Sequence, residues 1–373
     1  IVMDGWSLSL FIKQLLQLYG AAVVSGVRDD SAIIPSSLKP LVDTLSARRH
    51  TFQHDYWAAY LREGTPTCIV PLSQYHTDTE AENNSYVNQT NHVEINLSPD
   101  VCQKIQTLCS DYRITPAVIF YVAWGILLQR WCYADDVLFG ATISGRNIPI
   151  DGIEETLGLF INTLPLRLDI DRRGVETAAR EAHVRLSGLL AHEHAPLALA
   201  QRCSGVSPGA PLFSALLNYR HNNGEAVALP EGVSLLSAEE RTNYPFVLSV
   251  EDGGDSLGLT AQVRQPIEAQ RVCGYMAQAL SALAQALEQA PQTPVCELEV
   301  MPDEEYALQL CRWNHTAEAY PADTCVHELF EQQARLTPQA IALIQDAQRL
   351  SYAQLNARAN RLAHRLIERG VQP

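Results

Sequence analysis

Apolar residues near the start of the chain recur with the spacing of one helix face. They occupy positions 8, 11, 12, 15, 16 and 19. The pattern predicts a helix that begins at Ser7, whose side chain can cap the first turn, and ends at Gly20. Residues 21–45 lack this periodicity and contain Pro35 and Pro40. We therefore expect a surface excursion there.

Aromatic residues mark the next predicted helix, which runs from about Ala47 to Arg62 and would end at Gly64. Such a stripe is more typical of a hydrophobic core than of a substrate contact. Residues 64–91 are rich in Thr, Asn, Gln and Ser, and we expect an exposed connection there. The inward positions predicted for the helix are Phe52, Tyr56, Trp57, Tyr60 and Leu61.

Strands and helices alternate in the pattern after residue 91. Residues 92–97 have the period of a strand, and Ser98-Pro99 predicts a helix start with Ser98 as the N-cap. Thr115-Pro116 repeats that start, and the helix over 117–132 is apolar nearly all round, so it should be central. Further strands are predicted at 137–144, 212–220, 246–251 and 257–263, and further helices at 174–191, 195–203 and 266–289.

A Pro-containing stretch at 290–302 predicts a domain boundary. Beyond it, the pattern predicts a helix over 326–336 and two short strands, 341–344 and 350–351, around a turn. Ser351 should cap a last helix that ends at Gly370.

Composition narrows the class of protein. The chain has 373 residues, 47% of them hydrophobic and 18% charged, which suits two or three globular domains or part-domains. Its net charge of -15 disfavours nucleic acid as a partner. Nine cysteines without a C-x-x-C pair, and no signal peptide or membrane span, predict a cytoplasmic protein with reduced thiols at mostly helical core positions and no metal site.

The opening Asp4-Gly5-Trp6-Ser7 resembles the end of the His-His-x-x-x-Asp-Gly motif of the condensation domains of nonribosomal peptide synthetases. The resemblance places the two histidines, which include the catalytic base, immediately before Ile1. The stretch 158–167 (GLFINTLPLR) is similar to the Gly-x-Phe-Val-Asn-Thr motif of this family and follows Ser144-Gly145-Arg146. Two further stretches, 192–197 and 211–213, match later family elements only in part.

Residues 323–373 resemble the start of an adenylation domain. Leu350-Ser351-Tyr352-Ala353-Gln354-Leu355 is similar to its first core motif, Leu-Thr-Tyr-x-Glu-Leu. The resemblance implies an α/β, chloramphenicol-acetyltransferase-like fold of two lobes, with the first lobe truncated, followed by the first subdomain segment of an adenylate-forming domain. The implied domains are 1–70 (end of the N-terminal lobe), 93–290 (C-terminal lobe), 291–322 (linker) and 323–373 (start of the adenylation domain).

The resemblance also implies a function for the parent protein. Its condensation domain would form an amide bond between a carrier-bound acyl or peptidyl thioester and a carrier-bound aminoacyl amine. Its partners would be upstream and downstream peptidyl carrier domains with phosphopantetheine arms. ATP and Mg would serve the adenylation domain, and this chain alone should be inactive. Two alternatives stay open, an epimerisation domain and a non-catalytic docking domain; Gly5 and residues 158–165 argue against the first.

The resemblance implies a role for each candidate site residue. Asp4 would be a buried carboxylate that clamps the active-site loop through Arg146, unless Arg146 is a solvated loop residue. Gly5 either permits close approach of substrate or simply starts the helix. Ser144, Asn162 and Thr163, with Gly5, would line a substrate channel, although Asn162 and Thr163 could instead bond to backbone groups.

Overall fold

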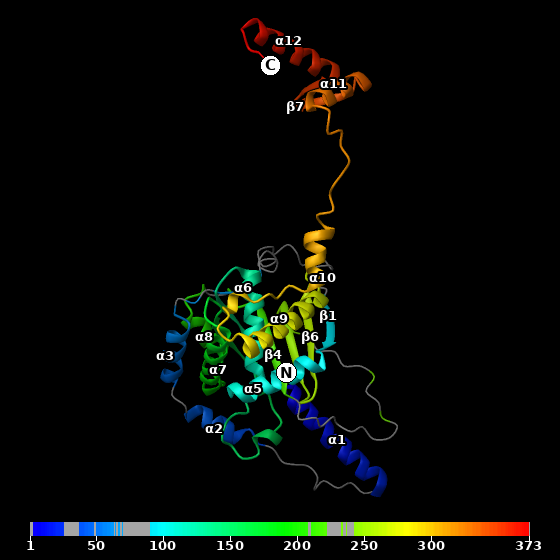
Figure 1. Ribbon diagram of the computed structural model, residues 1–373. Coiled ribbons are helices and arrows are strands. Elements are labelled where there is room, and N and C mark those ends of the chain that lie inside the picture. The colour runs from blue at the N-terminus through cyan, green and yellow to red at the C-terminus, as the bar shows by residue number, and fades with distance from the viewer. Residues whose placement is uncertain are drawn as a thin grey trace. The chain divides into compact units, whose positions relative to one another are not determined.

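The computed structural model in Figure 1 describes residues 3–25, 37–47, 50–62, 64, 66, 67, 69, 90–207, 210–221, 233, 236 and 242–372. The chain divides into two compact units, Ile1–Glu305 and Tyr306–Pro373. Each unit is described by itself.

The first unit is organised around a six-stranded mixed sheet with the order β1-β6-β5-β4-β2-β3. β2, β4 and β5 run parallel to one another, so their carboxyl ends lie at one edge of the sheet. The other neighbouring pairs are antiparallel. The strands are β1 (Thr90–Asn96), β2 (Asp136–Ile143), β3 (Asn162–Asp169), β4 (Ala215–His221), β5 (Phe246–Asp252) and β6 (Leu257–Arg264).

The register brings one row of apolar residues side by side across the sheet. Leu164, Ala141, Leu217, Leu248 and Ala261 are successive partners on five strands, and all are buried. Because side chains alternate along a strand, this row shares one face of the sheet. Two long helices, α6 (Pro116–Cys132) and α9 (Ala269–Gln289), contact each other and the sheet, and they bury that face.

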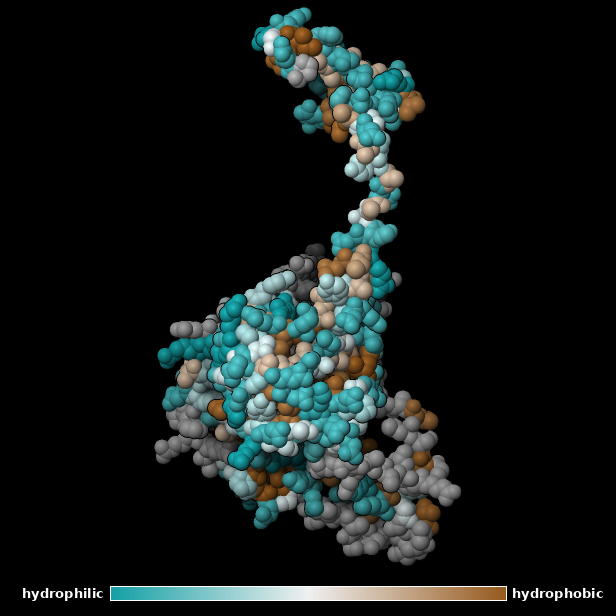
Figure 2. Space-filling model, viewed as in Figure 1, coloured by the Kyte–Doolittle hydropathy of each residue, from teal (hydrophilic) through white to brown (hydrophobic). Residues whose placement is uncertain are grey.

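The prediction that the helix over 117–132 is central is confirmed, because residues 118–128 of α6 are all buried. α5 (Pro99–Tyr112) begins as predicted, with the Ser98 side chain accepting a hydrogen bond from the Val101 amide. The remaining helices of this part of the chain are α7 (Val175–Ala191), α8 (Leu197–Cys203), the 3-10 helices η4 (Ile153–Glu155) and η5 (Val295–Glu297), and α10 (Asp303–Tyr306). Figure 2 shows that hydrophilic side chains dominate the visible face of the first unit.

The predicted ends of the first helix are wrong. α1 spans Gly5–Ser25, so Ser7 lies inside the first turn and Gly20 lies in the interior. Asp4 takes the capping position, since its Oδ1 accepts a hydrogen bond from the Ser7 amide at 2.8 Å. Asp and Ser are about equally good N-caps, so residue preference alone does not choose between Asp4 and Ser7. The residues after Gly20 are compatible with a helix, so this single glycine does not end α1.

Later boundaries also differ from the pattern. α2 (Lys39–Ala47) occupies the end of the predicted excursion, and α3 (His50–Tyr60) starts slightly after the predicted helix start. Most of the connection predicted at 64–91 lies outside the described residues, but Thr67 and Ile69 are buried, not exposed. Thr67 accepts a hydrogen bond from the Leu138 amide, which ties this stretch to β2.

The stretch at 291–305 belongs to the first unit by its contacts. Val295, Leu298 and Val300 are buried, and η5 packs on α6. Arg130 at the end of α6 donates hydrogen bonds to the carbonyl oxygens of Cys296 and Leu298. The prolines that predict a boundary therefore hold an extended segment whose apolar residues still reach the core.

The second unit matches its predicted elements. A π-helix, η6 (Ala307–Arg312), precedes α11 (Val326–Leu336), the hairpin of β7 (Ile341–Gln345) and β8 (Gln348–Ser351), and α12 (Tyr352–Glu368). Ser351 caps α12 as predicted, because its hydroxyl accepts a hydrogen bond from the Gln354 amide, and the Gln354 side chain accepts one from the Ser351 amide. The rings of Phe330 and Tyr352 pack at 5.9 Å between centroids.

Five of the eight described cysteines lie in helices, in or against the core, as predicted. Cys102, Cys109 and Cys273 are buried, and Cys132 and Cys203 pack against the core. In the described ranges, no single helix is long and apolar enough to cross a membrane; only α5 and α6 together, bent by 109°, pass by length and composition.

Candidate functional site at the start of α1

The carboxylate of Asp4 is the centre of a buried polar cluster. Its side chain is 3% exposed. Oδ1 accepts from the Ser7 amide, and Oδ2 accepts from the amides of Phe160 at 2.9 Å and Ile161 at 3.3 Å. The Asp4 amide itself donates to the carbonyl oxygen of Gly158. One acidic residue thus joins the first turn of α1 to the loop before β3.

Arg146 supplies the positive charge of the cluster. Its Nη2 lies 3.4 Å from Asp4 Oδ1, so the ion pair expected from the sequence is present, and the Arg146 side chain is 6% exposed. Its Nη1 donates to the carbonyl oxygens of Ile153 and Thr156. The guanidinium also lies over the ring of Phe160, 4.0 Å from its centroid. Arg146 is therefore a buried, hydrogen-bonded residue rather than a solvated one.

Ser7 is the member of the cluster whose role the sequence did not predict. It is completely buried. Its hydroxyl donates to the Gly158 carbonyl at 2.8 Å and accepts from Arg146 Nη2 and from the Gly158 amide. The only signal in the sequence is a serine three residues after a capping aspartate, which is common at helix starts without any such role.

Gly145 and Gly158 allow the loop after β2 and the loop before β3 to approach each other closely. Gly145 has φ +68, and a Cβ placed there would lie 2.0 Å from the carbonyl oxygen of Phe160. A Cβ at Gly158 would lie 2.8 Å from the ring of Phe160. Any larger residue at Gly145 would separate the Arg146 loop from the loop before β3.

Opposing effects set the charge state of Asp4. Burial raises the pKa of its carboxyl, but hydrogen bonds from Ser7 and Phe160 and the positive charge of Arg146 lower the pKa more, so it lies below its ordinary value. Burial lowers the pKa of Arg146, and Asp4 opposes that change. Both groups are therefore charged at neutral pH, and the pair has no proton to give or take.

The predicted channel residues lie next to members of the cluster along the chain. Asn162 donates from Nδ2 to the carbonyl oxygens of Glu193 and Ala195 and accepts from the Thr163 amide, which is the backbone-bonding alternative. Ser144 is exposed, and its hydroxyl accepts from the Arg146 amide. Gly5 opens α1, and no atom lies near its absent Cβ. The groove formed by Asp135, Asp171, Arg172, Arg173 and Glu181 involves none of these residues.

Of the inward positions predicted for α3, Trp57 and Leu61 are buried, and Tyr56 and Tyr60 are partly buried and pack against the core. The side chain of Phe52 lies outside the described residues. Trp57 is fully buried, and Tyr56 stacks on His192 at 3.8 Å between ring centroids. His192 is thus a packing residue. In the described part of the chain, no group of three or more His, Cys, Asp or Glu side chains is arranged to hold a metal ion.

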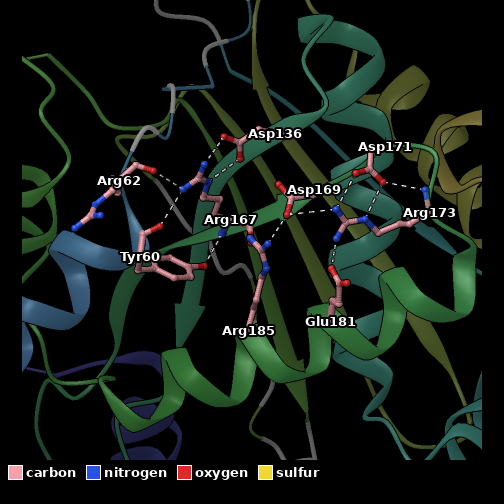
Figure 3. Close-up of polar contacts among 9 residues, drawn as sticks. All are labelled: Tyr60, Arg62, Asp136, Arg167, Asp169, Asp171, Arg173, Glu181 and Arg185. Atoms are coloured by element: carbon pink, nitrogen blue, oxygen red, sulfur yellow. Dashed lines mark hydrogen bonds and ion pairs between the residues drawn. The ribbon is translucent and has the colours of Figure 1, made fainter.

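Figure 3 shows how the end of α3 is attached to the sheet. Arg167 on β3 makes two hydrogen bonds of 2.8 Å to the Asp136 carboxylate and also donates to the carbonyl oxygens of Tyr60 and Arg62. The ion pair of Arg167 with Asp136 is partly buried. Beside it, Arg185 pairs with Asp169, and Arg173 with Asp171 and Glu181. These residues fasten α3 and α7 to β3.

Comparison with known proteins agrees with this geometry. The family described as Condensation domain matches residues 1–310, and the family described as AMP-binding enzyme matches residues 330–373. Malpinin synthetase of Mortierella alpina is 47% identical over 285 residues, which are 75% of this chain and 4% of that protein. A linear gramicidin synthase protein of Brevibacillus parabrevis is 32% identical over 383 residues, which cover 100% of this chain and 7% of that protein.

Solved structures share the fold. A crystal structure of a four-domain nonribosomal peptide synthetase bound to AMP and glycine has a TM-score of 0.70 at 16% identity, over 99% of this chain and 29% of that chain. The condensation domain of the monacolin K polyketide synthase MokA has a TM-score of 0.59 at 20% identity, over 79% of this chain and 69% of that chain.

The predicted α/β condensation fold is therefore confirmed. The chain spans only 4–7% of the length of the curated relatives named above. From the match over residues 1–310, the chain belongs to the condensation-domain family of nonribosomal peptide synthetases, and it continues into the start of an AMP-binding domain.

Proposed function

We propose that the chain is part of an elongation module in which the condensation domain forms an amide bond. The donor is an acyl or peptidyl thioester on an upstream carrier domain, and the acceptor is the amine of an aminoacyl thioester on a downstream carrier domain. Both thioesters are held on phosphopantetheine arms of the carriers. The adenylation domain of the same parent protein activates the amino acid with ATP and Mg.

One observation carries this proposal. The buried Asp4–Ser7–Arg146 cluster joins the three stretches that resemble condensation motifs: the opening residues, the loop after β2 and the loop before β3. Asp4 and Arg146 are 142 positions apart in the sequence. A cluster that brings motif remnants together from such distances supports a shared active-site scaffold in preference to separate structural roles.

The residues of this cluster act by positioning. Asp4 and Arg146 fix the N-terminus of α1, and the resemblance puts the general base just ahead of it, four residues before Asp4. A base held in place contributes on the order of 10²–10⁴-fold to a rate. Fixing the position of that base relative to two tethered reactants adds a proximity contribution.

ATP and Mg serve the parent adenylation domain as a whole, of which residues 323–373 resemble the start. The segment contributes a capped helix pair and a hairpin to that domain.

The test uses the complete parent module, loaded with a donor thioester and an aminoacyl acceptor on their carriers. We expect an amide-linked product on the downstream carrier, detected by mass spectrometry of the intact carrier. Asp4→Asn should remove most of this product, whereas Glu288→Gln, in an exposed pair with Lys104, should not.

Each other outcome contradicts amide formation. Inversion of the donor stereocentre without an amide would identify an epimerisation domain. Binding of both carriers with neither reaction, in a module that adenylates normally, would identify a docking domain.

A further inference from the structure

A histidine and an aspartate meet where β4 and β5 end. His221 and Asp252 are the last residues of these parallel strands and are partners in the register. His221 Nδ1 lies 2.8 Å from Asp252 Oδ2. Neither residue belongs to the Asp4–Arg146 cluster, and no motif in the sequence marks either of them.

Asp252 is held as a charged acceptor. Its side chain is 9% exposed. Oδ2 also accepts from the Tyr219 hydroxyl at 2.6 Å, and Oδ1 accepts from the Gly254 amide at 2.9 Å. Burial raises the pKa of this carboxyl, but the bonds from Tyr219, Gly254 and His221 lower it further, below the ordinary value.

The buried carboxylate fixes the state of the imidazole. An ionised carboxylate can only accept hydrogen bonds, so the proton of neutral His221 resides on Nδ1. The side chain is 58% exposed, and Nε2 remains as the ring nitrogen that can take a proton. An aspartate behind a histidine orients the ring and stabilises the imidazolium that forms when Nε2 is protonated.

The His221–Asp252 pair lies at the same edge of the sheet as the Asp4–Arg146 cluster. β2 is parallel to β4, and Ser144-Gly145-Arg146 follows directly after its carboxyl end. In open α/β sheets, ligands bind beyond the carboxyl ends of the strands. This edge of the sheet therefore carries the Asp4–Arg146 cluster at the end of β2 and the His221–Asp252 pair at the ends of β4 and β5.

The ionisable groups next to His221 do not compete with it as proton acceptors. Tyr219 and the buried Cys109 of α5 both have raised pKa values, mainly through burial and also through the charge of Asp252, so neither ionises near neutral pH. Arg220 and Glu251 pair with each other at 3.2 Å. Their side chains alternate with those of His221 and Asp252 and so lie on the other face of the sheet.

We propose that His221, oriented by Asp252, accepts the proton of the acceptor ammonium before the amine attacks, a step that precedes the one served by the base ahead of Asp4. The inference rests on the proposed function. An N–H bond of the ammonium breaks and an N–H bond to Nε2 forms, which leaves a neutral amine and an imidazolium. The imidazolium releases its proton to water after each turnover, so no other reactant is needed.

The test compares His221→Gln with wild type in the complete parent module. Glutamine keeps an N–H donor for Asp252 but accepts no proton. We expect amide formation with the aminoacyl acceptor at pH 7 to fall by about 10²-fold. The loss should shrink as pH rises, and it should vanish for an aminooxy acceptor, whose nitrogen is already unprotonated at pH 7.

The matched control is His54→Gln, because His54 faces the exposed Asp55 and should show no loss with either acceptor. Thermal unfolding checks that His221→Gln is folded, and His221→Asn replaces it if it is not. Equal losses with both acceptors would mean a structural role and overturn the inference, as would no loss at all. Wild-type protein that forms no amide would instead defeat the proposed function.

Discussion

The carboxylate of Asp4 is almost completely removed from water, and removing a charge from water is costly unless the protein replaces the lost solvation. Three backbone amides and one guanidinium do so here. Arg146 in turn bonds to two carbonyl oxygens and to Ser7. Each charge thus depends on the other and on backbone groups of three separate segments.

Replacing Asp4 by Asn should therefore be strongly destabilising. The substitution leaves Arg146 buried without a counter-charge, and breaking a buried pair in this way costs about 3–5 kcal/mol. The free energy of unfolding in urea at pH 7 measures the loss. Glu288→Gln, which breaks the exposed pair with Lys104, is the control and should change that free energy by less than about 1 kcal/mol. Equal stability of Asp4→Asn and wild type would disprove the clamp.

The lowered pKa of Asp4 predicts how this stability depends on pH. A carboxyl with a folded-state pKa below its unfolded value contributes its full stability above about pH 5. The contribution is lost as pH falls below about 4, through the unfolded value and towards the folded one. The difference in unfolding free energy between wild type and Asp4→Asn should therefore be constant near neutral pH and should shrink in acid. A difference that grows in acid would mean that the pKa is raised.

Gly145 and Gly152 form a matched pair of positions that tests how closely the loop after β2 approaches the loop before β3. Both have positive φ, +68 and +76, so alanine is strained at either position, by about 1 kcal/mol. A Cβ at Gly145 also collides with the Phe160 carbonyl, whereas nothing lies within 4 Å of one at Gly152. Gly145→Ala should lower the melting temperature clearly more than Gly152→Ala does. Similar changes in the two variants would mean that the loops separate easily.

At the scale of elements, α6 shows what an all-round apolar pattern means. Helices with polar and apolar faces lie at a surface, whereas this one contacts β2, β4, α5, α7 and α9. By contrast, α1 has a similarly apolar sequence, but Leu8, Leu15 and Tyr19 are about half exposed. The pattern identifies both helices, but it does not say which is covered.

Leu127→Ala tests the central position of α6. Leu127 is fully buried, and removing a buried leucine side chain costs about 2–5 kcal/mol through lost burial and the cavity left behind. Val184, which is 69% exposed on α7, is the control, and Val184→Ala should stay within about 0.5 kcal/mol. Urea unfolding measures both. A small effect at Leu127 would contradict a close-packed core around α6.

At the scale of the whole molecule, the boundary between the two compact units falls between Glu305 and Tyr306 along the chain. Residues 315–320 between η6 and α11 have no regular structure and are exposed. Glu305 is held on the first unit by two hydrogen bonds from Arg271, of 2.6 and 2.8 Å. The chain is thus anchored up to Glu305 and open to solvent some ten residues later.

Limited digestion with endoproteinase Glu-C should therefore cleave after Glu318, which is exposed and is followed by Ala319. Mass spectrometry should detect a fragment that ends there. Glu193 and Glu305, which are buried in the first unit, provide the internal comparison and should resist cleavage while that unit is folded. Cleavage at these residues before Glu318 would contradict the division into units.

Local patterns by themselves determined most elements of this protein and the resemblance to the condensation family. Capping and periodicity act over a few positions. They determined the starts of the helices after Ser98 and Ser351, the central helix and the final hairpin. Only the tertiary structure decided that Asp4, not Ser7, caps α1, that Ser7 joins Arg146, and that His221 meets Asp252. The contacts of Ser7, Arg146 and His221 connect residues 31 to 151 positions apart. They depend on the path of the backbone and on the register of parallel strands, which no local pattern records.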